Sequence, residues 1–117
     1  MKLKETADFI IEYNDKLDAV YHTIMNHDIN LVGWQELLLT GTEYIEKHGC
    51  RRWLSDNRKL GSHSKETEQW INGVWLPRTI AAGWNTWALV RLGGSLTQLH
   101  SLRVPRPERD RIERPKL

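Results

Sequence analysis

The chain has little cysteine, phenylalanine and proline, and it has no long apolar run. Its 117 residues include one cysteine, Cys50, so no disulfide can form within the chain. A lone cysteine of this kind favours a reducing compartment. The first residues lack the apolar segment of a signal peptide, and no stretch reaches the roughly 20 apolar residues that span a bilayer. These absences predict a single cytoplasmic domain with no membrane span.

Several chemical signatures are also missing. The sequence has no glycine-rich phosphate loop, no Gly-x-Ser-x-Gly turn and no Cys-x-x-Cys pair. Its five histidines do not occur at the spacing of a zinc site. We therefore predict no cofactor, no metal and no complete catalytic set.

Tryptophan is abundant, with six residues against a single phenylalanine. Each tryptophan brings a large apolar surface and one N–H group that needs an acceptor when it is buried. Because six of them cannot all occupy the centre of so small a core, we expect Trp34 and Trp75 to contribute to a partner-facing surface. A platform for stacking bases or sugars is the less favoured interpretation of the same residues.

The apolar pattern predicts the element order β-β-α-β-α-β. The two helices show apolar residues at spacings of three and four, which places Val74 and Arg78 among the residues of the predicted buried side of the second helix. The strands are short and apolar. The predicted elements are a hairpin (9–13 and 19–25), a helix (32–48), a strand (51–55), a helix (65–82) and a strand (86–90). Gly41 lies inside the first helix, where a small residue permits close packing on a sheet. Pro77 removes one hydrogen bond from the second helix and predicts a kink there.

The pattern stops after Val90. Residues 103–117 contain three prolines, six basic and three acidic residues, and thus a net charge of +3. This composition predicts a disordered tail behind a domain that spans residues 1–102. A nucleic-acid contact through the tail is the less favoured alternative, because acidic residues alternate with the basic ones.

Two short runs carry a resemblance to a known family. They are Trp-Leu-Ser-Asp-Asn-Arg at 53–58 and Trp-Leu-Pro-Arg at 75–78. Over about residues 9–90 the chain resembles small, mostly uncharacterised bacterial STAS-like proteins, which share the SpoIIAA-like fold of anti-sigma-factor antagonists. The resemblance implies an α/β sheet of about four strands with helices packed on it, and a regulatory role without catalysis. The phosphorylatable serine turn of the antagonists is absent, since residues 56–64 read Asp-Asn-Arg-Lys-Leu-Gly-Ser-His-Ser.

Asp56, Asn57 and Arg58 follow the third predicted strand. Ligands of open α/β sheets bind beyond the carboxyl ends of the strands, and an arginine there can bind a carboxylate or phosphate. We therefore predict that these residues, with Arg78, bind a small anionic ligand or a protein partner. The plainer interpretation is that Asp56 caps the turn and pairs with Arg58.

The preferred function is thus a non-enzymatic binding module that acts through a protein partner, a second copy of the chain or a small anionic ligand. The alternative is a small hydrolase or transferase in which Asp56 and His63 form an acid–base pair.

Overall fold

Alternating apolar residues build a sheet of six strands, two more than expected. The computed structural model describes residues 1–91 and 100–103. The sheet order follows the chain order, from β1 to β6. The strands are β1 (Lys2–Glu5), β2 (Phe9–Asn14), β3 (Ala19–Ile24), β4 (Arg52–Asn57), β5 (Thr86–Arg91) and β6 (His100–Arg103). The β3–β4 and β4–β5 pairs are parallel, and the other three pairs are antiparallel.

The two additional strands lie at the edges of the sheet. β1 has one apolar residue, Leu3, so its sequence shows no alternation that predicts a strand. β6 pairs with β5 through its backbone, and the prediction placed no strand after Val90. An edge strand needs only one neighbour, and its side chains need not be apolar. The predicted tail at 103–117 lies outside the described residues apart from Arg103, which belongs to β6.

The first helix is confirmed almost to the residue. α1 spans Leu31–His48, and the Asn30 side chain caps it by accepting a hydrogen bond from the Gly33 N–H. It ends at Gly49, which has a left-handed φ of 74°. A Cβ on Gly41 would lie 2.2 Å from the Trp53 ring, which confirms that a small residue is needed there for helix–sheet packing.

The second helix is continuous but contains an extra residue in its middle turns. It consists of α2 (Lys65–Trp70), the π-helical segment η1 (Ile71–Trp75) and α3 (Leu76–Ala81). The Leu76 N–H bonds to the Ile71 carbonyl, five residues earlier, one position before Pro77.

The buried face of this second helix differs from the prediction. Thr67, Trp75 and Thr79 are buried, whereas Val74 is 48% exposed and Arg78 also lies at the surface. A strictly α-helical projection had placed Val74 and Arg78 on the buried side. A π-helical turn contains more residues than an α turn and therefore rotates the later side chains around the axis.

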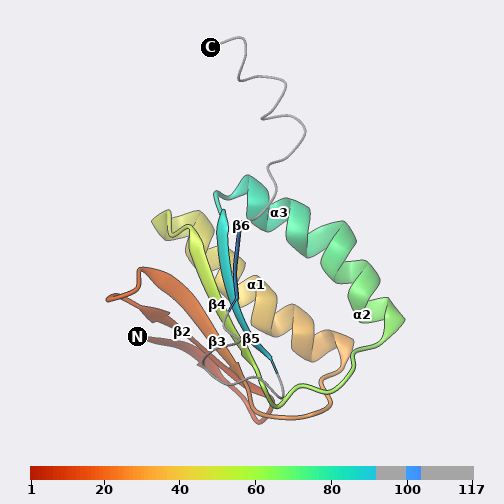
Figure 1. Ribbon diagram of the computed structural model, residues 1–117. Coiled ribbons are helices and arrows are strands. Elements are labelled where there is room, and N and C mark those ends of the chain that lie inside the picture. Colours follow the sequence, from red (N-terminus) through yellow and green to blue (C-terminus); the bar gives the residue numbers. More distant parts are fainter. Residues whose placement is uncertain (92–99, 104–117) are drawn as a thin grey trace.

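Both helices cover the same face of the sheet (Figure 1). Two successive parallel crossovers, β3–α1–β4 and β4–α2–β5, advance in one direction across the sheet. Since such connections are right-handed, both place their helices on one side. No helix of the described part of the chain covers the opposite face, which we call the open face. No helix in residues 1–91 is long and apolar enough to cross a membrane.

Tryptophans form the core between helices and sheet. The rings of Trp53, Trp75 and Trp84 lie within 5.0–6.1 Å of one another, and Trp87 packs on Trp84. The Trp75 N–H donates to Thr42 Oγ1 of α1 at 2.9 Å. Trp34 and Trp75 are each only 4% exposed, so the expectation that they form a partner-facing surface is wrong. A tryptophan is readily buried when its N–H group finds an acceptor within the core.

Candidate functional site

The carboxyl ends of β3 and β4 gather most of the predicted site residues, but on two different faces. Side chains alternate along a strand, so Asp56 and Asn57 point in opposite directions. Trp53 packs on the helices, which places Asn57 on the helix-covered face and Asp56 on the open face. The run of three polar residues therefore forms two separate groups.

Asp56 and Arg58 form a closed ion pair. Arg58 Nε donates to Asp56 Oδ1 at 3.0 Å and Nη2 donates to Oδ2 at 2.8 Å. The Arg58 N–H also bonds to Oδ1 at 3.2 Å, as the turn-capping interpretation predicts. These bonds hold the pKa of Asp56 below its ordinary value. The Asp56 side chain is 8% exposed and that of Arg58 is 59% exposed, so only the cation projects into solvent.

On the helix-covered face, Asn57 belongs to a buried set centred on His22. Trp53 Nε1 donates to His22 Nδ1 at 2.9 Å, so Nδ1 is an acceptor and the proton of the neutral ring lies on Nε2. His22 Nε2–H then donates to Asn57 Oδ1 at 2.9 Å. Burial disfavours the charged ring and lowers the pKa of His22 to about 4. The three side chains link β3 to β4 through a histidine that stays uncharged near neutral pH.

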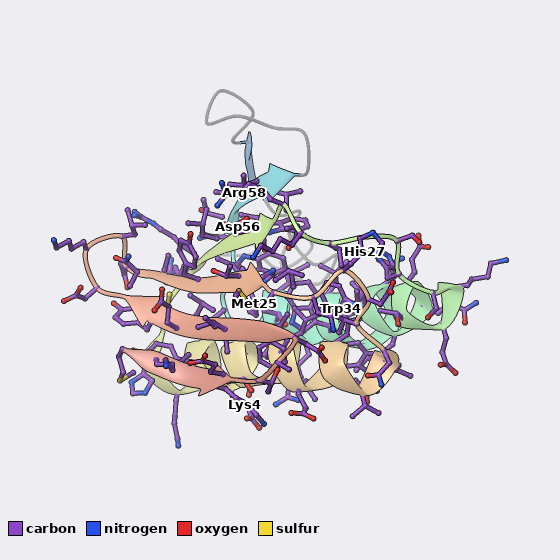
Figure 2. The ribbon with its side chains drawn as sticks, turned by 90° about the horizontal axis from the view of Figure 1, so that it is seen from below. Lys4, Met25, His27, Trp34, Asp56 and Arg58 are labelled. Atoms are coloured by element: carbon purple, nitrogen blue, oxygen red, sulfur yellow. The ribbon has the colours of Figure 1, made fainter. Side chains whose placement is uncertain are left out.

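Two loops meet in front of the start of α1. The Gly61 N–H of the β4–α2 loop donates to the His27 carbonyl of the β3–α1 loop at 2.9 Å. The His27 ring lies directly on Gly61, where a Cβ would be 2.2 Å from the imidazole. Figure 2 shows Met25 below Asp56 and Arg58 in this view, and His27 above Trp34. The two loops thus form one surface at this edge of the sheet.

Trp34 lies in the first turns of α1, behind these loops. Its ring meets the ring of His63 edge-on, with the centroids 6.1 Å apart, so the indole extends from α1 toward the β4–α2 loop. Trp34 is only 4% exposed, and its Nε1–H has no acceptor among the described residues. Trp53, Trp75, Trp84 and Trp87 all have an acceptor for the same group.

Arg78 is not part of this edge. It lies on α3, shortly before the amino end of β5, and its guanidinium makes two hydrogen bonds to Glu46 of α1, at 2.9 and 3.0 Å. The pair joins the two helices and lowers the pKa of Glu46. His63 is also separated from Asp56, because His63 packs on Trp34 at the helix layer while Asp56 faces the open side. Among the described residues, the hydrogen bonds of Asp56 all go to Arg58, and none joins it to His63, its partner in the alternative function.

The prediction missed His22 and the buried N–H of Trp34, for which the described residues offer no acceptor. His22 had a detectable signal, since it is the polar residue between Val20 and Ile24 on the apolar face of a strand. The lack of an acceptor for Trp34 has no sequence signal, because it depends on which side chains surround the indole. Among the described residues, no three histidine, cysteine or acidic side chains converge on a point that would hold a metal ion.

Comparison of the chain with protein-family models, with curated proteins and with solved structures found no match.

Proposed function

We propose that the protein is a non-enzymatic, STAS-like binding module that holds a small anionic ligand where β3 and β4 end and α1 begins. The ligand class is a carboxylate or a phosphate. The element order supports the STAS-like part of the proposal. The order hairpin, helix, strand, helix, strand runs from β2 to β5 in the structure, between the additional strands β1 and β6. Support for binding rather than catalysis is that the polar groups here are already engaged with one another.

The observation that carries the proposal is the buried N–H of Trp34, which has no acceptor among the described residues. A buried donor without an acceptor costs about 1–3 kcal/mol, which an oxygen atom of a ligand would recover. The indole ring extends toward the loop after β4, at the edge at which ligands of open α/β sheets bind. The exposed His63 and its loop separate the indole from solvent on this side.

The backbone at the start of α1 favours an anion, against the carboxylates of Asp8 and Asp28 nearby. The first turn of α1 contains no acidic residue, whereas α2 carries Glu66 and Glu68 in its first turn. The amino end of a helix attracts negative charge, and α1 is 18 residues long and capped by an uncharged asparagine. The carboxylate of Asp8, which lies beside Gly33, is bonded to Asn26. The cationic Arg58 begins the loop whose His63 packs on the indole.

The test is a titration of the ¹⁵N-labelled protein with inorganic phosphate and with acetate, followed through the indole N–H signals. Trp34→Phe removes the donor but keeps most of the ring, and the signal that disappears identifies Trp34. We expect that signal alone to shift and saturate in the wild type. Trp70→Phe, which changes a half-buried tryptophan on α2, should leave the titration unchanged.

Two outcomes of this titration would contradict the proposed anion site. If no indole signal moves with either anion, the acceptor of Trp34 is an ordered water only, and the proposed ligand site does not exist. If the affinity is the same in Trp34→Phe as in the wild type, the anion binds elsewhere.

A further inference from the structure

The open face of the sheet presents apolar side chains in its centre. The register aligns Tyr21, Leu54 and Ala88 in one row across β3, β4 and β5. Ile10 and Val90 lie in the next row toward the carboxyl edge. All five side chains are partly exposed, and none of the described helices packs on them.

A shallow hollow deepens this face near the amino ends of the parallel strands. It has a volume of about 230 Å³, and its walls are mainly apolar. Leu17, which precedes β3 and is 48% exposed, forms part of its rim with Ala19 and Thr86. Exposed apolar surface of this kind marks an interaction site more often than an isolated exposed leucine does.

The charges along β4, the strand at the centre of the open face, are arranged so that this strand complements a second copy of itself. Along β4 the outward residues are Arg52, Leu54 and Asp56, a cation, an apolar residue and an anion in succession. A two-fold axis along the Tyr21–Leu54–Ala88 row would place a second copy face to face with the first. That rotation exchanges the rows on either side of the axis, so each Arg52 faces the partner's Asp56.

We propose that a second copy of this chain covers the open face in a two-fold symmetric, sheet-on-sheet contact. Leu54 packs on its own symmetry mate at the axis, and the two sheets lie about 10 Å apart. Val90 of each copy lies opposite Thr86 of the other, at the rim of the hollow. The contact is isologous and closes on itself, so it yields a dimer rather than a fibre.

The ion pairs in this contact need one local change. Within the described part of the chain, Asp56 Oδ2 accepts one hydrogen bond, from Arg58, and a carboxylate oxygen can accept two. Arg58, with 59% of its side chain exposed, moves aside enough to admit the incoming guanidinium. Arg52 gives up its 3.2 Å bond to the Leu17 carbonyl, which is an exposed contact and easily replaced by water.

Light scattering after size exclusion, over a dilution series of the full chain, measures the association. We expect the wild type to form a dimer. Its dissociation constant should rise at least about a hundredfold in Leu54→Glu, because a charge is then buried without a partner. Val74→Glu is the matched control, since Val74 is also apolar and exposed but lies on η1, away from the open face. Arg52→Glu should also weaken the dimer, and added salt should partly restore it by screening the repulsion between the introduced carboxylate and Asp56.

Cross-linking of cysteine variants tests the same interface even where Leu54→Glu fails to fold. A bismaleimide of about 10 Å span should join two Leu54→Cys chains. It should not join two Val74→Cys chains, because Val74 lies away from the open face. The native Cys50 is buried and should not react in either variant. A wild-type chain that stays monomeric at every concentration overturns the proposal. A dimer that Leu54→Glu leaves intact, or a folded Leu54→Cys dimer that does not cross-link, overturns the assigned interface.

Discussion

At the scale of single residues, His22 shows how surroundings set the chemistry of a side chain. A histidine in water titrates near pH 6.5, but this ring is enclosed by the core and holds its neutral form through two hydrogen bonds. In one of these bonds His22 Nδ1 accepts from the Trp53 N–H, and this fixes the proton of the neutral ring on Nε2. Protonation would force the Trp53 N–H against an N–H of the ring, so acid removes a contact at the centre of the molecule.

This arrangement predicts acid destabilisation over a defined range. The pKa of His22 is about 4 in the folded chain and 6.5 when unfolded, so between these values the unfolded state binds more protons. The free energy of unfolding should therefore fall by about 2 kcal/mol between pH 6.5 and 4.5. Asp56 and Glu46 have lowered pKa values, so their contribution is lost only at lower pH.

Urea unfolding followed by tryptophan fluorescence at a series of pH values measures this loss. His22→Gln keeps one acceptor and one donor and should abolish the dependence in this window. His48→Gln, which removes an exposed histidine, should retain it. A slope that persists in His22→Gln would assign the loss to another group.

At the scale of elements, the packing of α1 on the sheet depends on a missing side chain. Gly41 lets the helix approach β4 so closely that an added Cβ would meet Trp53 at 2.2 Å and Ile11 at 3.0 Å. Trp53 cannot easily yield, because it is 1% exposed and its N–H is bonded to His22. The glycine therefore weakens the isolated helix but strengthens the helix–sheet contact.

Gly41→Ala and Gly73→Ala should have opposite effects. The first overpacks the core and should lower the free energy of unfolding by about 1–3 kcal/mol, despite the better helix propensity of alanine. The second places a methyl group where no atom of the described residues lies within 4 Å, so it should raise the free energy of unfolding by about 0.5–1 kcal/mol. Both values come from urea unfolding, and a neutral Gly41→Ala would mean that α1 can shift away from Trp53.

At the scale of the whole molecule, the protein is a sheet covered by helices on one side. The inner strands β3, β4 and β5 hold the tryptophan core, while β1 is an edge strand whose register is interrupted between Lys2 and Lys4. Stability should therefore be uneven, highest in the central strands and lowest at this edge.

Amide hydrogen exchange tests this distribution. We expect the amides of β3 and β4 to exchange at least about a hundredfold more slowly than those of β1, because they open only with the whole core. The comparison should be made below and above the concentration at which the chain associates. Equal protection of β1 and β4 would show that the edge strand unfolds together with the core.

Local patterns determined much of this protein. Period-two and period-3.6 spacing located the hairpin, α1, β4 and β5, and both helices end within one residue of the predicted position. The sequence also indicated the Asp56–Arg58 turn, because the two residues are neighbours along the chain and interact without the rest of the fold. The edge strands β1 and β6 were missed, since their place in the sheet depends on a neighbouring backbone.

Only the tertiary structure decided which face each side chain occupies. It buried Trp34 and Trp75, rotated the second helix by a π turn, sent Asp56 and Asn57 to opposite faces and moved Arg78 to a pair with Glu46. Among the described residues, it also left one buried donor without an acceptor and one sheet face without a helix. The physical reason is the distance along the chain over which each feature arises. Periodicity and capping depend on residues a few positions apart. Burial, hydrogen-bond acceptors and the surroundings of His22 depend on residues about thirty positions away, which only folding brings together.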